Sequence, residues 1–137
     1  MRILVVDDEL VSRKKLQKIM ESFGECDAVE NGKEAIAAFV KSLEDWNLYS
    51  LITLDVSMPG MDGTEVLSKL REIEKENYMT EKEQAKVLMV TSHSEKDTVM
   101  TSIEAGCDDY IVKPFDKKVV TKKLERLGFC RLKTFYA

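Results

Sequence analysis

The chain has 137 residues, 44% of them hydrophobic, which suffices for the core of one ordinary domain but not of two. Its formal net charge of −4 argues against a general nucleic-acid binder, because such modules usually carry a basic excess. No apolar run approaches the roughly 20 residues of a membrane span, and the chain begins with a strand pattern instead of a signal peptide, so we expect a cytoplasmic protein without membrane contact.

Short apolar runs alternate with helical periodicity in the first half of the chain. Residues 3–6 form an apolar run typical of a buried strand, and apolar residues at helical spacing then predict a helix that ends near Gly24. A weaker strand pattern follows at 26–29. Gly32 opens a second helical pattern, and another strong apolar run at 51–54 predicts the third strand.

The second half of the chain continues this alternation. A helical pattern after Gly63 extends toward a charged segment, and a polar stretch at 77–84 separates it from the next strand. The remaining expected elements are a strand at 86–90, a helix at 95–105, a strand at 110–112 and a helix at 116–127 that begins at an acidic residue.

Five apolar strands alternating with five helices indicate a parallel sheet that is covered on both faces. We therefore predict a doubly wound α/β fold of the flavodoxin-like type, with five strands in the order 2-1-3-4-5. The domain is expected to span residues 1–127. Residues 128–137 then form a C-terminal tail with exposed apolar groups.

The cysteines give no sign of a disulfide framework or a metal site. Cys26, Cys107 and Cys130 are odd in number and lack the close spacing of cysteine ligands. We expect them to be reduced residues that contribute to packing.

Charged residues stand where three of the predicted strands end. Asp7 and Asp8 follow the first strand, Asp55 closes the third strand before a Pro/Gly-rich turn, and Lys113 follows the fifth strand. The carboxyl ends of parallel strands meet at one edge of a sheet, which is where open α/β sheets place their chemistry. We therefore expect three carboxylates and one ammonium in a single cleft.

Three ionised carboxylates would not share a cleft without neutralisation. Two like charges about 4 Å apart repel by roughly 4 kcal/mol at an effective dielectric near 20. A divalent cation together with Lys113 balances the charge, and oxygen ligands that leave positions to water suit Mg²⁺. If Asp55 attacked a phosphoryl donor, this cation and Lys113 would stabilise the transferring group, and the Thr91 hydroxyl could reach a phosphoryl oxygen.

These residues resemble a known family in type, order and strand position. From about residue 2 to residue 127, the chain is similar to the receiver domain of two-component response regulators, in particular the stand-alone, chemotaxis-type receivers. The residues that carry the resemblance are Asp7-Asp8, Asp55 with Met58-Pro59-Gly60-Met61-Asp62-Gly63, Thr91-Ser92 and Lys113-Pro114-Phe115.

The resemblance implies that Asp55 is the phosphoacceptor. Its phosphoryl group would come from a histidine kinase, a phosphotransfer protein or a small donor such as acetyl phosphate. The carboxylates of Asp8 and Asp55 and the backbone carbonyl of Ser57 would bind Mg²⁺, or Mn²⁺ in its place. Asp7 would complete this metal site by holding the waters of the ion. Lys113 and Thr91 would be the catalytic partners.

The resemblance also implies a conformational switch and a cis peptide bond. Phosphorylation would favour the state in which Thr91 moves toward the phosphoryl group and Tyr110 turns inward. The Lys113-Pro114 bond is expected to be cis. A downstream protein would then bind a surface made of the fourth helix, fifth strand and fifth helix, through Ile103, Tyr110, Val119, Lys122 and Arg126.

The same resemblance sets expectations for turnover, assembly and signal lifetime. The protein would catalyse only its own phosphorylation and dephosphorylation, without external turnover. It would be a monomer or a weak dimer that makes no direct contact with nucleic acid. His93 lies two positions beyond Thr91 and is either a residue that influences signal lifetime or an exposed loop histidine without function.

Two other classes of function remain open. Hydrolases of the haloacid dehalogenase type also form an aspartyl phosphate beside Mg²⁺, but they carry a second aspartate two positions after the nucleophile, where this chain has Ser57. A receiver-like interaction module that ignores phosphate is the other alternative. A nucleotide-binding protein is less favoured, because the sequence has neither of the common glycine-rich phosphate loops.

Overall fold

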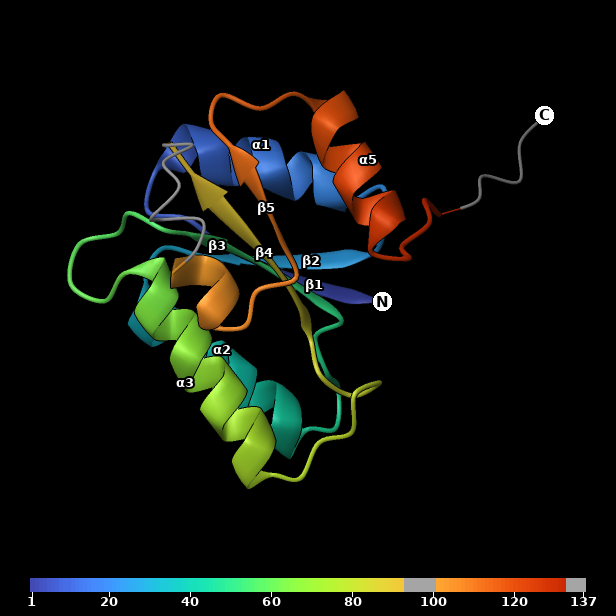
Figure 1. Cartoon of the computed structure of the whole chain (residues 1–137). Helices are drawn as coiled ribbons and strands as arrows, with labels where there is room; N and C mark the ends of the chain where they lie inside the picture. Colours follow the sequence, from blue (N-terminus) through green and yellow to red (C-terminus); the bar gives the residue numbers. More distant parts are fainter. Residues whose placement is uncertain (93–100, 133–137) are drawn as a thin grey trace.

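The computed structural model describes residues 1–92 and 101–132 and shows a parallel sheet with helices on both faces (Figure 1). The elements are β1 (Arg2–Val6), α1 (Leu10–Met20), β2 (Glu25–Val29), α2 (Gly32–Glu44), β3 (Leu51–Asp55), α3 (Gly63–Glu76), β4 (Lys86–Thr91), β5 (Asp109–Val112) and α5 (Lys117–Arg126).

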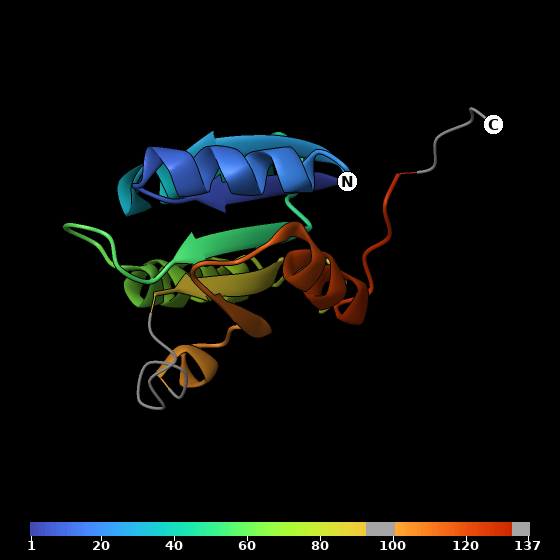
Figure 2. The same ribbon diagram turned by 90° about the horizontal axis from the view of Figure 1, so that it is seen from above.

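The sheet has the predicted topology. All four strand pairs are parallel, and the order is β2-β1-β3-β4-β5. Figure 2 shows the strands in this sequence, from β2 at the top to β5 at the bottom. The predicted doubly wound α/β fold is therefore confirmed, and all five strands carry their carboxyl ends to the same edge.

Most predicted element boundaries agree with the structure to within a few residues. The first helix is the clearest difference: it ends at Met20, and a turn leads from there to Gly24. The helix expected at 95–105 lies partly outside the described residues, and its described part is helical at 101–104.

Asparagine and aspartate side chains begin three of the helices. Asn31, Asp62 and Asp116 each accept a hydrogen bond from the backbone N–H three residues further on, at 2.8, 2.9 and 2.8 Å. Such N-caps satisfy one of the backbone donors that a helix start leaves unpaired. In α1 the cap residue is Glu9, which makes no side-chain cap bond.

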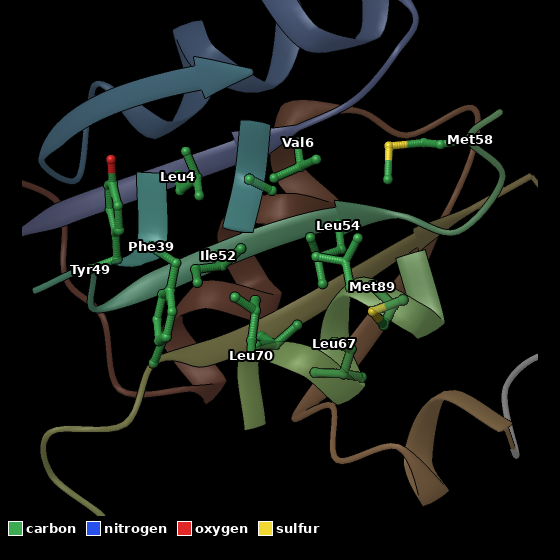
Figure 3. Close-up of a cluster of buried hydrophobic side chains, with 14 residues drawn as sticks. Leu4, Val6, Phe39, Tyr49, Ile52, Leu54, Met58, Leu67, Leu70 and Met89 are labelled. Carbon is green, nitrogen blue, oxygen red and sulfur yellow. The ribbon is translucent and has the colours of Figure 1, made fainter. Parts of the chain in front are cut away.

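Alternate residues of the strands feed two separate hydrophobic cores, as the twofold periodicity of a strand requires. One core joins the sheet to α2 and α3 (Figure 3) and includes Leu4, Ile52, Leu54, Phe39 and Leu70. The other joins the opposite face to α1 and α5 and includes Ile3, Val5, Leu16, Phe23 and Leu124. Both cores support the central strands β1, β3 and β4.

The described part of the tail packs partly on the domain. Phe129 is half-buried against the core beneath α1 and α5, and the Leu132 N–H donates to the Ser22 carbonyl at 2.8 Å. The tail therefore packs back on the domain at Phe129, whereas Leu132 is 59% exposed. Phe135 and Tyr136 lie outside the described residues.

The three cysteines differ in their burial. Cys26, Cys107 and Cys130 are all free, and Cys130 is exposed, so it does not contribute to packing as expected. Burial, with help from Glu21 and Asp27, raises the pKa of the Cys26 thiol to about 12. Among the helices of the described residues, none is long and apolar enough to cross a bilayer.

Candidate functional site

The carboxyl ends of β1, β3 and β5 bring the four predicted charged residues together. Asp55 is the last residue of β3, and Asp7 directly follows β1. Because Val6 pairs with Leu54, Asp7 lies beside Asp55. Lys113 directly follows β5 and reaches both carboxylates. The expectation that these charges share one cleft is confirmed.

The geometry of this cluster is close. One carboxylate oxygen from each of Asp7, Asp8 and Asp55 lies within 4.8 Å of the other two. Asp7 is 0% exposed and Asp55 is 4% exposed, whereas Asp8 is open to solvent. The Lys113 Nζ lies 3.1 Å from Asp7 Oδ2 and 3.3 Å from Asp55 Oδ2. One ammonium thus contacts two of the three carboxylates in the cluster.

Backbone donors hold one oxygen of each buried carboxylate. The Glu9 N–H donates to Asp7 Oδ1 at 2.9 Å, and the Ser57 N–H donates to Asp55 Oδ1 at 3.2 Å. The other Asp7 oxygen, Oδ2, is buried and has no hydrogen bond among the described residues, only the ion pair with Lys113. A buried carboxylate oxygen that lacks a hydrogen bond favours the binding of a further cation at the site.

Burial and the neighbouring Asp7 raise the pKa of Asp55 to about 7, although Lys113 acts in the opposite direction. Burial alone would lower the pKa of Lys113, but Asp55 and Asp7 raise it above its ordinary value. The ammonium therefore stays charged, while Asp55 resists full ionisation near neutral pH. The single positive charge of Lys113 is too small to neutralise the carboxylates of the cluster.

The turn after Asp55 folds back against the strand end. A Cβ at Gly63 would lie 2.3 Å from the Asp55 carbonyl oxygen, so only glycine allows this approach. The Gly63 N–H also donates to the Val56 carbonyl at 3.0 Å. Gly63 therefore sets the path of the loop that holds Ser57 beside Asp55.

Two further predicted residues stand on the neighbouring strands. Thr91 ends β4, is 3% exposed, and its carbonyl accepts the Lys113 N–H at 2.7 Å. Tyr110 lies on β5 and is half-buried, with Lys123 Nζ 5.2 Å from its ring centre. Thr91 is thus close to the cluster through the backbone of Lys113, whereas Tyr110 packs against the core of α2 and α3 and is reached by Lys123 from α5.

Two residues of α1 that no sequence motif indicated support the site. Arg13, on α1, donates from Nη1 to the Asp7 carbonyl at 3.0 Å. Lys15, also on α1, donates to the Phe115 carbonyl and lies 4.9 Å from the Phe115 ring. Both residues lie on α1 and belong to no recognisable motif, so the sequence did not indicate these contacts. His93 lies outside the described residues.

The surroundings of Lys113 agree with one more expectation. The Lys113-Pro114 peptide bond is cis. Phe115 follows it and is buried against α1 and α5. A hollow on the side of α1 is lined in part by Ser12, Ser92 and Lys113.

Comparison with protein families gives a match over most of the chain. Residues 3–125 match the model of the response regulator receiver domain. The transcriptional regulatory protein ResD of Bacillus subtilis is 41% identical over 127 residues, which cover 92% of this chain and 47% of ResD. The chain spans about half the length, or less, of the first curated relatives it matches.

Solved structures give the same assignment. CheY in the CheX-CheY-BeF₃-Mg²⁺ complex of Borrelia burgdorferi has a TM-score of 0.78 and 28% identity, over 93% of this chain and 89% of that one. The receiver domain of the Arabidopsis thaliana histidine kinase CKI1, complexed with Mg²⁺ and BeF₃⁻, has a TM-score of 0.74 and 26% identity, over 91% and 89% of the two chains.

Proposed function

This chain belongs to the response regulator receiver domain family, and we propose that Asp55 is the residue through which it acts as a phosphorylation-dependent signalling switch. The observation that carries the proposal is the cluster itself. A nearly buried carboxylate at the end of β3 lies against Lys113 and two further carboxylates. This arrangement combines a nucleophile, a fixed cation and spare oxygen ligands in one place.

Receiver domains of this family bind Mg²⁺, and the residues present here fit that ion. We assign the ligands to the carboxylates of Asp8 and Asp55 and to the Ser57 carbonyl, with Asp7 holding the waters of the ion and Mn²⁺ as a substitute. Hard oxygen donors, and an Asp7 Oδ2 that has an ion pair but no hydrogen bond, suit a divalent cation. When bound, the cation supplies positive charge for the oxygens of the transferring phosphoryl group.

In the transfer step, a carboxylate oxygen of Asp55 attacks the phosphorus of the donor. The bond from phosphorus to the histidine nitrogen, or to the acetyl oxygen of acetyl phosphate, breaks, and its electron pair leaves with the donor. Asp55 becomes an acyl phosphate with about one more negative charge than before. Lys113, 3.3 Å from Asp55 Oδ2, stabilises that added charge throughout the step.

The added charge supplies the free energy for the switch. Thr91 turns its hydroxyl toward the phosphoryl oxygens, and Tyr110 moves inward from its half-buried position on β5. These contacts exist only in the phosphorylated protein. They can therefore shift the equilibrium toward the switched conformation by no more than the difference in free energy that they make between the two conformations. Water attack on phosphorus later restores the carboxylate, so the protein catalyses both its own phosphorylation and its own dephosphorylation.

Receiver domains exchange signals with histidine kinases and with downstream proteins. For this chain we assign the donor to a histidine kinase or a phosphotransfer protein. The output surface comprises the segment before β5, β5 itself and α5, where Ile103 and Val119 are 55% and 44% exposed. The receiver unit comprises residues 1–127, with 128–137 as a tail, and it works as a monomer or weak dimer.

Labelling with acetyl phosphate and Mg²⁺, followed by intact-protein mass spectrometry, tests the assignment of Asp55. The wild type should gain one phosphoryl group, and Asp55→Asn should gain none. Asp62→Asn is the matched control, because Asp62 lies in the same loop but caps α3 and is outside the cluster. An Asp55→Asn protein that is folded and still labelled would refute the assignment, as would steady turnover of a generic phosphate ester by the wild type.

A further inference from the structure

The end of α2 places an aromatic residue where helices usually have glycine. The Trp46 N–H donates to the Leu43 carbonyl at 3.2 Å, and the Asn47 N–H donates to the Ser42 carbonyl at 2.9 Å. This pair of bonds defines the Schellman motif, whose central residue adopts a left-handed conformation. Trp46 has that conformation, with φ of 50°.

The end of α3 repeats this arrangement. The Tyr78 N–H donates to the Lys75 carbonyl and the Met79 N–H donates to the Glu74 carbonyl, both at 3.1 Å. Tyr78 is the central residue, with φ of 52°. Two neighbouring helices therefore end with a bulky aromatic residue in a backbone conformation that a Cβ atom disfavours.

Other helix ends of the same chain have the residue that this motif favours. At the end of α5, the N–H groups of Gly128 and Phe129 make the corresponding bonds to Glu125 and Leu124, both at 3.0 Å. Gly128 has φ of +95°, and Gly106, before β5, has φ of +101°. The chain thus uses glycine for the same turn elsewhere, which makes the two aromatic residues exceptions within one molecule.

Packing does not explain these exceptions. Trp46 is 77% exposed and Tyr78 is 92% exposed, so most of each ring contributes nothing to the cores. Tyr49, by contrast, is 3% exposed and belongs to the core of α2 and α3. A disfavoured backbone conformation lowers the stability of the fold, and an exposed ring does not offset that loss by burying apolar surface. We therefore infer that the two side chains have a role other than stabilising the fold.

The two aromatic residues belong to loops that meet at one end of the molecule. The α2–β3 loop and the α3–β4 loop end side by side, where the Lys86 N–H at the start of β4 donates to the Ser50 carbonyl at 2.9 Å. A hollow of about 670 Å³ is lined by both loops, including Leu48 and Glu83, and by Phe129 of the tail. The loops precede β3 and β4, so this end lies opposite the edge that carries Asp55 (Figure 1).

The surroundings of the rings favour a cationic partner. Each helix directs its carboxyl end, with its partial negative charge, to this loop pair. Acidic residues outnumber basic ones by one in each of the segments 41–46 and 75–83. Three other rings, Tyr49, Phe115 and Tyr110, each have a cation of the chain 4.3 to 5.2 Å from their centres. Among the described residues, neither Trp46 nor Tyr78 has such a contact.

We propose that Trp46 and Tyr78 form a docking surface for a basic segment of another protein, whose arginine or lysine side chains stack on the two rings. Exposed aromatic rings attract such cations, and Trp and Tyr are the residues that most often dominate protein interfaces. This surface lies away from the phosphoryl site and does not depend on the assignment of Asp55.

Thermal unfolding tests whether Trp46 and Tyr78 stabilise the fold. Trp46→Gly and Tyr78→Gly relieve the disfavoured conformation, so each should raise Tm by about 2 to 5 °C. Gly128→Tyr is the matched control and should lower Tm, because a Cβ there meets nothing within 4 Å and only the backbone conformation is penalised. If both glycine variants lowered Tm, the rings would serve the fold and the proposal would be overturned.

Binding of a fluorescent oligoarginine peptide, followed by anisotropy in Mg²⁺ buffer, tests the partner chemistry. The wild type should bind it, and Trp46→Gly and Tyr78→Gly should each weaken binding about fivefold, whereas an oligoglutamate peptide of equal length should not bind. Asp55→Asn, which alters the other acidic region, should bind as the wild type does. Equal affinity in the wild type and both glycine variants, or no binding by the wild type, would overturn the proposal.

Discussion

At the scale of single residues, Lys113 decides how the buried carboxylates behave. Its Nζ lies between Asp7 and Asp55, at 3.1 and 3.3 Å, and no backbone group could carry the charge that it supplies. A buried ion pair that loses one partner leaves an uncompensated charge, which costs more than the pair contributes when intact. Both stability and reactivity of the site should therefore depend on this one side chain.

The substitution Lys113→Ala should lower the free energy of unfolding by about 2 kcal/mol at neutral pH and slow labelling by acetyl phosphate more than tenfold. Urea unfolding and a labelling time course measure the two effects. Lys86→Ala is a control, because Lys86 pairs with Asp108 at 3.7 Å with 42% of its side chain exposed, so the change should stay within about 0.5 kcal/mol. Equal losses in the two variants would contradict this role for Lys113.

The raised pKa of Asp55 makes stability depend on pH. With its pKa at about 7 instead of the ordinary 3.8, Asp55 binds its proton more tightly in the folded state. Stability from this group is therefore greatest below pH 4 and decreases as pH rises through 7. Without divalent cations, Asp55→Asn should be more stable than the wild type at pH 8, by about 1 kcal/mol or more.

The difference in stability between Asp55→Asn and the wild type should shrink as the pH falls from 8 to 5, because the wild-type Asp55 carboxyl then becomes neutral. Urea unfolding in the presence of a chelator, for both proteins across this range, provides the measurement. A difference that is constant with pH, or a variant that is less stable at pH 8, would show that Asp55 is not held in an excess of negative charge.

At the scale of elements, the loop from β3 to α3 fixes the position of Asp55. Gly63→Ala would force a Cβ against the Asp55 carbonyl oxygen, which lies 2.3 Å from its ideal position. We expect a loss of about 2 kcal/mol or more in unfolding free energy, together with slower labelling. In Gly60→Ala, the Cβ meets nothing within 4 Å, and only the φ of +81° is unfavourable. Its loss should be about 1 kcal/mol, with labelling retained.

How far sequence predicts an element depends on whether its signal is local. The strands were predictable because apolar runs at 3–6, 51–54 and 86–90 need no knowledge of their neighbours. The end of α2 was not, because Trp46 replaces the glycine that normally indicates a helix end, whereas the polar stretch from 77 correctly indicated where α3 ends. Gly63 was part of a recognisable motif, but its contact with the Asp55 backbone became evident only in three dimensions.

The same distinction applies to the site. Asp7, Asp8, Asp55 and Lys113 could be predicted as a group, because parallel strands bring their carboxyl ends to one edge. Arg13 and Lys15 could not, since their contacts with Asp7 and Phe115 depend on how α1 packs across the sheet. The roles of Thr91 and Tyr110 in switching stay predictions, because they concern a second conformation.

At the scale of the whole molecule, Mg²⁺ should act as a stabilising ligand. A cation that binds only the folded state adds about 1.4 kcal/mol at ten times its dissociation constant. Asp8→Asn should weaken this effect with little change in the stability of the metal-free protein, because Asp8 is exposed. Glu9→Gln, which changes the neighbouring exposed carboxylate outside the cluster, should keep it. Thermal unfolding across a Mg²⁺ titration distinguishes the two variants.

Locating the phosphoryl group on the chain is the most direct test of whether Asp55 accepts it. Borohydride reduces an aspartyl phosphate to a stable homoserine, so peptide mass spectrometry of the reduced protein identifies the modified residue. After treatment with acetyl phosphate and Mg²⁺, we expect homoserine at position 55, in amounts that fall when the cation is removed. Reduction at Asp7, Asp8 or Asp62 instead, or at no aspartate, would contradict it.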